Sequence, residues 1–427
     1  MPRVSRTALA ALLLLAASAQ AQHTAADLPR VVDAAAVARL DAALSGFVER
    51  GDVAGVSALV VERGEEAYVG AYGMADREAG VPMSRETIAL IYSMTKPVTG
   101  VALMTLWEDG AFDLDDPLAD HLPEFADVRV YAGEDADGEP VLEAPRRPVT
   151  VRDITRHTAG IGADGGHEGL AALLRAADPM NLENPLDEMA RRFASVPLGF
   201  HPGEQWAYGP SVDLQAALVE RISGQPYRQY VREHVLDPLG MTETRYVVPE
   251  ADRDRLAAMY RRGEPADGTL ARVPDAQVRA FNTRAWPLTP GGWGLTSTLD
   301  DYSRFAQMLL GGGVLDGVRV LRPETVRLMA TSALDDAVTE RMWLPSKGQV
   351  GFGIDFAVRV RPPQSADENP GTVGEFFWDG AASTLFWVDP VHELTAVLFV
   401  QLMPFDGVGL HHGVREALYG PYRPRGG

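Results

Sequence analysis

The sequence predicts a mixed α/β fold in which one antiparallel sheet is built from both chain ends and flanked by helices, with a large, mostly helical insertion between the ends. Strand patterns occur near both ends of the chain, whereas apolar residues in the middle recur at helical spacing. The chain has 427 residues, 46% of them hydrophobic, which permits a large buried core. We expect the sheet part at about 32–90 and 346–420 and the helical part at about 93–345.

Each part of this fold has its own sequence signal. Residues 32–49 carry apolar side chains at helical spacing, and Gly51 ends the expected helix. Two β-branched or aromatic runs on either side of Gly64 predict a hairpin. An acidic, glycine-containing stretch at 126–147 predicts a second, exposed hairpin. Further helices are expected at 97–109, 151–157, 211–223, 227–235, 299–311, 323–330 and 408–419, and strands at 56–62, 67–72, 350–360, 374–378, 382–388 and 394–402.

The first 21 residues have the features of a secretory signal peptide. Arg3 and Arg6 supply the positive start, and the apolar run that follows is too short to cross a bilayer. Ala19 and Ala21 fit a small-x-small cleavage site, so we expect cleavage after Ala21. This leaves a single domain at 22–427, periplasmic or secreted, with no stable membrane anchor. A short N-terminal membrane anchor is the alternative.

The composition excludes several classes of function. Acidic residues outnumber basic ones by 59 to 39, for a net charge of −20, so we expect no nucleic-acid partner. The chain has no cysteine, and therefore no disulfide, thiolate metal site or cysteine nucleophile. No third ligand accompanies His411 and His412 at a suitable spacing. We interpret these two as a solvated helix start and expect no metal or cofactor.

Lysine is rare in this chain: Lys96 and Lys347 are the only two, and every other basic residue is arginine. Such a chain is expected to keep a lysine where the chemistry needs an ammonium that can lose its proton. Lys96 follows Ser93 by three residues, less than one helical turn, so both side chains project from one face. A buried lysine whose pKa is lowered can take the proton of a serine and make it a nucleophile. The alternative is an N-cap serine beside a surface lysine.

Two further segments carry candidate chemistry. In Gln205–Ser211, Tyr208 stands just ahead of an expected helix, where a phenol can pass protons between a serine and a lysine. Phe377–Ser383 leads into a strand, and its small residues allow a substrate to lie against the strand edge, with the Ala381 N–H as an oxyanion donor. Taken alone, Tyr208 also fits an ordinary half-buried tyrosine, and the third segment fits a tight turn.

The order of these three motifs resembles that of the serine β-lactamases and penicillin-binding proteins. The wider pattern is most similar to the class C β-lactamase-like esterases, known as family VIII carboxylesterases, and covers roughly residues 35–420. The matching segments are Tyr92–Thr99, Thr150–Asp153, His157–Gly160, Pro202–Gly203, Gly291–Leu295, Asp301–Tyr302, Gly351–Gly353 and Trp378–Pro390.

The resemblance implies a role for each motif residue. Ser93 would be the acylated nucleophile and Lys96 the base that primes it. Tyr208 would relay the proton to the leaving group and later activate water. The backbone N–H groups of Ser93 and Ala381 would form the oxyanion hole. The expected substrate-pocket residues are Tyr92, Trp378, Asp379 and Gly380.

Two departures from the β-lactamase pattern bear on the substrate. The third motif of β-lactamases begins Lys-Thr-Gly, where the cation holds the substrate carboxylate, whereas this chain has Trp378-Asp379-Gly380. Pro210 also replaces the usual asparagine of the tyrosine motif. We therefore expect that the cation is missing and that an acid lies beside the site. Both departures weigh against β-lactams, and Trp378 favours an apolar acyl or alcohol group.

The sequence thus predicts a serine hydrolase that cleaves carboxylic esters with short acyl chains, on small-molecule ester or acyl substrates, through an acyl-enzyme. Acyl transfer to another alcohol is a close variant. The alternatives are a β-lactamase or D-alanyl-D-alanine carboxypeptidase, and a non-catalytic penicillin-binding sensor. His157 is a competing candidate for the base, but we interpret it as a structural hydrogen-bonding residue. No Gly-x-Ser-x-Gly motif occurs, which argues against an α/β-hydrolase.

Overall fold

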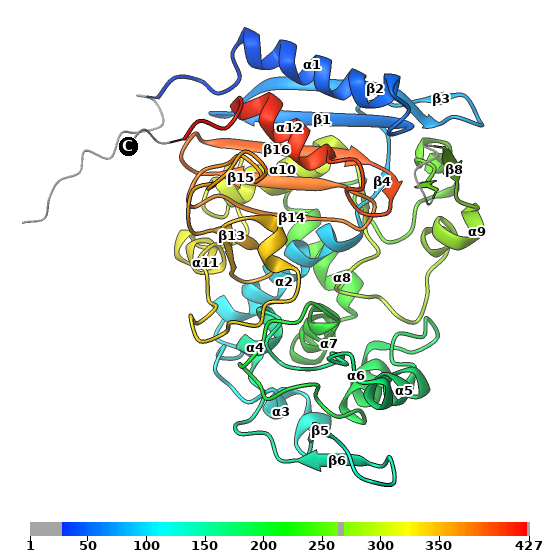
Figure 1. The fold of residues 1–427 in the computed structure, drawn as a ribbon, viewed down its shortest axis with the longest axis vertical. Coiled ribbons are helices and arrows are strands. Elements are labelled where there is room, and N and C mark those ends of the chain that lie inside the picture. The colour runs from blue at the N-terminus through cyan, green and yellow to red at the C-terminus, as the bar shows by residue number, and fades with distance from the viewer. Residues whose placement is uncertain (1–27, 264–268, 425–427) are drawn as a thin grey trace, which may run out of the picture.

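An eight-stranded antiparallel sheet forms the centre of the computed structural model, which describes residues 28–263 and 269–424. The expected signal peptide lies outside the described residues. The strand order is β12-β13-β14-β15-β16-β1-β2-β3 (Figure 1). The strands are β1 (Gly55–Glu62), β2 (Glu65–Asp76), β3 (Val81–Pro82), β12 (Val350–Phe352), β13 (Ala357–Arg359), β14 (Phe376–Asp379), β15 (Leu385–Asp389) and β16 (Leu394–Val400).

The pairing of β1 with β16 joins the two ends of the chain. The register runs from Val56 opposite Val400 to Glu62 opposite Leu394, and the other edge of β1 pairs with β2. The predicted antiparallel sheet made from both chain ends is therefore confirmed. The hairpin around Gly64 is confirmed as well, since β1 and β2 flank it.

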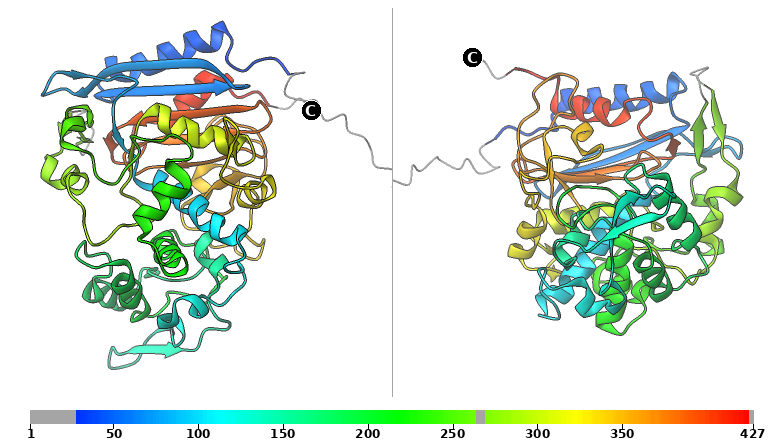
Figure 2. Two further views of the ribbon diagram at one scale, coloured as in Figure 1. Left: turned by 180° about the vertical axis from the view of Figure 1, so that it is seen from behind. Right: turned by 60° about the horizontal axis from the view of Figure 1, so that its bottom comes forward.

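Helices cover both faces of this sheet. The helices α1 (Ala34–Glu49) and α12 (Leu410–Tyr419) lie side by side on one face (Figures 1 and 2). On the other face, α10 (Leu299–Leu310) packs against β1, β15 and β16. Because both faces are covered, every residue of β1 and β16 is buried. These strands therefore read as nearly continuous apolar runs.

Much of the inserted segment forms the lower part of the molecule in Figure 1, and its first α-helix is α2 (Thr95–Glu108). This helix packs against α7 (Ser211–Ser223) and α8 (Tyr227–Val231), and it is buried over most of its length. Side chains near its start therefore emerge inside the core. The inserted segment also contains α4 (Val151–Thr155), α5 (Glu168–Ala177), α6 (Leu186–Ala194) and α11 (Pro323–Met329).

Two predicted strands differ from those observed. The single strand expected at 350–360 is wrong, because β12 and β13 are separated by a tight turn. In that turn Asp355 has φ +59°, and a Cβ on Gly353 would lie 2.0 Å from the carbonyl oxygen of Met329. The strand expected from residue 382 begins at Leu385, since the residues before it form a turn after β14.

The helical part contains elements that the sequence pattern did not reveal. The helices α5 and α6 were not predicted, and the helix expected at 227–235 consists of α8 followed by a π-helical turn at Arg232–Leu236. The hairpin expected within 126–147 is present as β5 (Val130–Glu134) and β6 (Pro140–Glu143). Among the described residues, no helix is long and apolar enough to cross a membrane.

Candidate active site

Ser93 lies on a tight turn between the short strand β4 (Ala89–Leu90) and α2. Tyr92–Met94 form a 3₁₀ turn, so Ser93 lies in the turn before α2 instead of inside the helix. Tyr92 has φ +43°, a left-handed conformation that is unfavourable for a bulky side chain. Strain of this kind concentrates at sites where the fold holds a neighbouring group in a fixed direction. Here that neighbouring group is the hydroxyl of Ser93.

The amine of Lys96 lies beside this hydroxyl, with Nζ 3.1 Å from Ser93 Oγ. The same Nζ donates to the carbonyl oxygen of Gly292 at 2.7 Å. Lys96 is only 5% exposed, because α2 runs through the core at this point. The structure therefore brings together the two side chains that the Ser-x-x-Lys spacing places on one face.

Asp213, in the first turn of α7, holds the loop that carries Gly292. Its Oδ1 accepts the Gly292 N–H at 2.9 Å. A Cβ on Gly292 would lie 2.9 Å from Asp213 Oδ2 and 3.2 Å from Lys96 Nζ, so glycine alone fits between carboxylate and amine. Burial raises the pKa of Asp213, and the charge of Lys96 opposes that rise. Asp213 thus positions the carbonyl group that Lys96 contacts.

Asp355 is a second buried carboxyl group that feels the charge of Lys96. Its Oδ1 accepts a hydrogen bond from Gln215 Nε2 at 3.0 Å, whereas Oδ2 has no partner among the described residues. Burial raises the pKa of Asp355 well above its usual value, although the Gln215 hydrogen bond and the charge of Lys96 both act to lower it. Burial therefore favours the neutral form of the Asp355 carboxyl group, even though the charge of Lys96 acts on it.

His157 is fully buried but does not form the hydrogen bonds expected of it. Neither ring nitrogen has a partner within the described ranges. The ring instead packs among aromatic side chains, 4.8 Å from the Tyr208 ring centroid and 5.4 Å from that of Phe352. Burial, and then the charge of Lys96, lower the pKa of His157 well below its usual value. The interpretation of its side chain as a hydrogen-bonding element is wrong, because its contacts are packing contacts.

Tyr208 approaches the same place from the loop before α7. Lys96 Nζ lies 4.7 Å from its ring centroid, so the amine faces the ring. The Tyr208 hydroxyl oxygen accepts the indole N–H of Trp378 at 3.2 Å, which leaves the phenol O–H free to be donated. Within the described part of the chain, no hydrogen bond joins this hydroxyl to Ser93 or Lys96.

Gly380 allows the end of β14 to lie against the turn of Ser93. A Cβ at this position would lie 2.4 Å from the Ile91 carbonyl oxygen and 2.3 Å from Thr384 Oγ1, so a side chain is excluded. The next residue, Ala381, lines the same pocket as Ser93. The backbone N–H groups of Ser93 and Ala381 have no acceptor among the described residues. Two free N–H groups beside a nucleophile can bind an oxyanion.

An ion pair between Lys347 and Asp379 lies beside Ser93. The ammonium group of Lys347, at the end of the 3₁₀ turn Leu344–Lys347, contacts the carboxylate of Asp379 at the end of β14. Each residue is 7% exposed. The expectation that a cation is missing here is therefore wrong. The loop before β12 supplies one, because it folds back onto the end of β14.

These groups line a pocket of about 450 Å³. Two aromatic side chains in its wall remain partly exposed, Trp343 at 37% and Phe405 at 43%. The pocket therefore opens to solvent between these two apolar side chains. The lining residues are Ser93, Tyr208, Trp343, Ser346, Lys347, Asp379, Ala381 and Phe405.

The four predicted pocket residues differ in where the structure places them. Asp379 lines the pocket. Trp378 is fully buried behind Tyr208, and Gly380 is buried against the turn of Ser93. Tyr92 lines a neighbouring pocket of about 350 Å³, together with apolar residues such as Trp293. The aromatic wall beside Ser93 thus comes from Trp343 and Phe405 instead.

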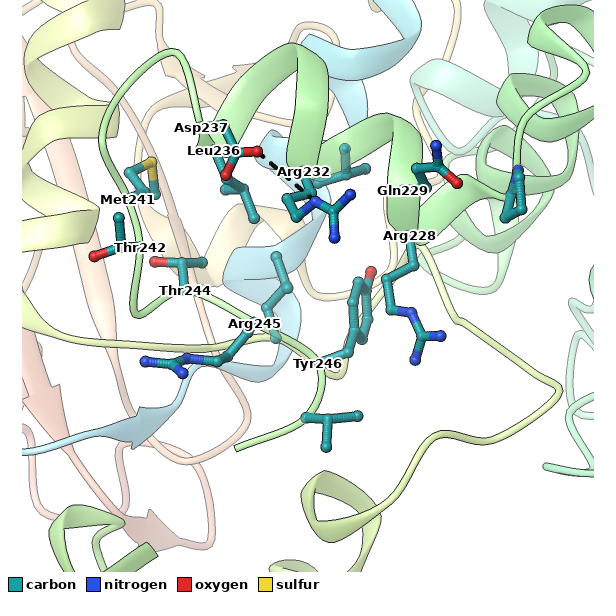
Figure 3. A pocket seen from close by; sticks show the side chains of 14 residues that line it. Arg228, Gln229, Arg232, Leu236, Asp237, Met241, Thr242, Thr244, Arg245 and Tyr246 are labelled. Carbon is teal, nitrogen blue, oxygen red and sulfur yellow. Dashed lines mark ion pairs between the residues drawn. The ribbon is translucent and has the colours of Figure 1, made fainter. Parts of the chain in front are cut away.

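A larger pocket of about 510 Å³ lies apart from Ser93, between α8, the π-helical turn and the following loop (Figure 3). Arg232 forms an ion pair with Asp237 at its rim, at 3.7 Å. Thr242 and Thr244 line it, but no lysine or histidine does. The one carboxylate in its lining, Asp237, is paired with Arg232, so the pocket lacks the serine–lysine pair found beside Tyr208, and the candidate chemistry lies in the pocket of Ser93.

Sequence reasoning did not find Asp213, Gly292, Trp343 and Lys347. A signal existed for two of them. Gly292 falls in a segment of the family resemblance, and Lys347 is one of the only two lysines. No local pattern marks Asp213 or Trp343, because their importance depends on contacts across the fold. His411 was also misinterpreted, since it is buried and its ring hydrogen-bonds the Ser383 carbonyl oxygen at 2.8 Å.

A serine hydroxyl beside a buried amine, next to two free N–H groups in a largely apolar pocket, defines a serine hydrolase. Comparison with known families agrees with this class. The Beta-lactamase family model matches residues 40–419, nearly all of the described chain. The protein therefore belongs to the β-lactamase family.

Individual relatives cover the same region. An uncharacterised protein of Mycobacterium tuberculosis is 35% identical over 85% of this chain and 89% of its own length. Esterase EstB of Burkholderia gladioli is 32% identical over 91% of this chain and 96% of its own. Among solved structures, EstCE1, described as a hydrolase with promiscuous acyltransferase activity, has a TM-score of 0.71 and 25% identity. It covers 90% of this chain and 99% of its own. The predicted fold and family are confirmed.

Proposed function

We propose that this protein hydrolyses carboxylic esters with short acyl chains through an acyl-enzyme on Ser93. The observation that carries the proposal is the 3.1 Å contact between Ser93 Oγ and Lys96 Nζ at the floor of a largely apolar pocket. The similarity to Esterase EstB supports ester substrates. A pocket of about 450 Å³ suits a small ester.

In the first step Lys96 acts as the base: its amine takes the proton of the Ser93 hydroxyl as Oγ attacks the ester carbonyl carbon. The contact with the Gly292 carbonyl fixes the amine, so that its lone pair can point to the hydroxyl. The negative charge that develops on the carbonyl oxygen is bound by the N–H groups of Ser93 and Ala381. Because these groups are already in place, little reorganisation is needed in the transition state.

When the tetrahedral intermediate collapses, the bond to the alcohol oxygen breaks and that oxygen needs a proton. Tyr208 donates its free O–H proton to the alcohol oxygen. Lys96, which lies beside the Tyr208 ring, then gives the proton that it took from Ser93 to the Tyr208 oxygen. In the second half of the cycle the same groups remove a proton from water as its oxygen attacks the acyl carbon. When the bond between that carbon and Ser93 Oγ breaks, the proton passes to Oγ, which restores the Ser93 hydroxyl and releases the acid. The role of Trp378 is to hold the phenol oxygen in place.

Acyl transfer to an alcohol is the second candidate, and a specific feature favours it. The pocket opens between the partly exposed side chains of Trp343 and Phe405, where an acceptor alcohol can enter in place of water. EstCE1, whose structure is similar to that of this chain, is described as a hydrolase with promiscuous acyltransferase activity. In contrast, the neutralised Lys347 does not favour β-lactam or cell-wall peptide carboxylates.

Intact-protein mass spectrometry after mixing with p-nitrophenyl butyrate tests the proposal, with release of nitrophenol followed in parallel. We expect turnover and a transient butyryl adduct of the native protein, and neither with Ser93→Ala. Addition of a short alcohol separates transfer from hydrolysis by the ester product that it yields. Turnover retained in Ser93→Ala, or a stable β-lactam adduct without ester turnover, contradicts the proposal.

We also propose that the chain is exported and cleaved after Ala21, on the strength of the signal-peptide features of its first residues. The test is N-terminal sequencing of the protein isolated from its own host. A mature chain that begins at Gln22, found outside the cytoplasm, is the expected result. An intact Met1 on cytoplasmic protein contradicts this proposal.

A further inference from the structure

The surroundings of Lys347 differ from those of an ordinary surface lysine. Its Nζ contacts the Asp379 carboxylate and lies 5.1 Å from the ring centroids of Trp343 and Trp378 and 4.8 Å from that of Phe405. The ammonium is thus enclosed by one carboxylate and three aromatic faces, with attractive cation–π geometry. These contacts leave the ammonium in the wall of the pocket, close to Ser93.

The two charges cancel within the wall of the pocket. Removing either partner would leave a charge that is buried, uncompensated and adjacent to bound substrate. Lys347 alone would attract a carboxylate, and Asp379 alone would repel one. A substrate carboxylate that approaches Lys347 also meets the carboxylate of Asp379, which lines the same pocket at the end of β14 and repels it.

We propose that Asp379 is a specificity-determining residue: by neutralising Lys347, it restricts the pocket to uncharged esters and excludes esters that carry a carboxylate. This inference rests on the proposed esterase function and names its substrate class. It predicts that a diester is hydrolysed once and that the resulting anionic monoester is a poor second substrate.

Dimethyl glutarate and monomethyl glutarate are matched probes, since they differ by one methyl group and one negative charge. Hydrolysis is followed by pH-stat, and kcat/KM is measured for each with the full protein. For the native protein we expect the diester to be preferred and the reaction to stop at the monoester. In Asp379→Asn, the unpaired Lys347 should lower the diester-to-monoester ratio of kcat/KM tenfold or more.

The double variant Asp379→Asn with Lys347→Gln separates charge from structure. Because this pocket is neutral again, the ratio should return toward the native value, which a merely structural defect would not produce. Lys347→Gln alone leaves Asp379 negative and should raise the ratio above the native value. This comparison with the native protein still decides the question if Asp379→Asn does not fold.

Asp300→Asn is the control for the change in net charge. Asp300 forms an ion pair with Arg85 and does not line the pocket, so its ratio should equal the native one. A native ratio in both Asp379→Asn and Lys347→Gln overturns the inference. Failure of the native protein to hydrolyse dimethyl glutarate or p-nitrophenyl butyrate instead refutes the proposed function, so the two failures are distinct.

Discussion

The N–H of Gly292 donates to Asp213 at 2.9 Å, and its carbonyl group on the other side accepts from Lys96 at 2.7 Å. One glycine therefore separates a buried carboxylate from the proposed base while linking both to the same peptide segment. Through this link, α7 and the loop before β9 (Thr296–Ser297) affect the position of the Lys96 amine, which projects from α2.

Gly292→Ala should lower kcat for p-nitrophenyl butyrate by about 10- to 100-fold, the size of loss that a small misplacement of a catalytic group produces. The added Cβ would lie 2.9 Å from Asp213 Oδ2 and 3.2 Å from Lys96 Nζ, so one of them must move. Steady-state kinetics measure the effect. Gly46→Ala is the control, because it lies on α1 and meets only the flexible end of Arg50; native kcat in Gly292→Ala would refute this positioning role.

Trp378→Phe should lower kcat about two- to tenfold with little change in KM, because loss of one hydrogen bond is worth about 0.5–1.5 kcal/mol. The indole N–H that holds the Tyr208 oxygen at 3.2 Å is removed while most of the packing remains. Trp387→Phe is a closely matched control. It removes an indole N–H to the Tyr419 hydroxyl at 3.0 Å, remote from Ser93, and should leave kcat native. Equal losses in both variants would mean that the effect is only structural.

His157→Phe should make the protein less sensitive to acid. The folded protein keeps His157 neutral, because its pKa is lowered, whereas the unfolded chain takes up a proton below about pH 6.5. Stability is therefore lost as the pH falls below that value, by up to about 1.4 kcal/mol per pH unit. Urea unfolding at pH 7.5 and 5.5 should show a smaller drop in the free energy of unfolding for the variant.

His392 should affect the pH dependence of stability in the opposite direction to His157. The hydrogen bond to Asp389 raises the pKa of His392, so its stabilising contribution is full below about pH 6.5 and is lost as the pH rises through the folded-state pKa. His392→Asn should therefore lose stability at pH 5.5 and little at high pH. The same change in pH dependence for both histidine variants would contradict these assignments.

Asp355→Asn should stabilise the protein at pH 7 by about 1–2 kcal/mol, since ionising a buried carboxyl group whose pKa is raised is unfavourable in the folded state. The unfolded chain ionises above about pH 3.8, so the gain should shrink as the pH falls to 4. Asparagine also tolerates the left-handed backbone at φ +59°. Urea unfolding at both pH values measures the difference.

Asp316→Asn is the control for that backbone effect. Asp316 has φ +51° but is exposed, with a side chain that is 65% accessible and pairs with Arg304. Its substitution should change stability little and equally at both pH values. A pH-independent change in Asp355→Asn would show that burial of its charge is not the cause.

The sequence by itself determined the fold class, the family and the meeting of Ser93 with Lys96. Period-two and period-3.6 patterns report which faces are buried, and a three-residue spacing across one helical turn is a local property. The same holds for the hairpin at Gly64 and for most of the helices. Patterns of this kind need no knowledge of what lies across the fold.

Only the tertiary structure decided the charge of the pocket and the surroundings of the amine. Lys347 lies 32 residues before Asp379, and Asp213 lies 79 residues before Gly292, so no local pattern links the members of either pair. Trp378 was expected in the pocket, yet it lies behind Tyr208, because the loop before β12 brings Trp343 there instead. Contacts between distant segments depend on how helices and loops pack on the sheet, and that packing sets which charges are paired beside Ser93.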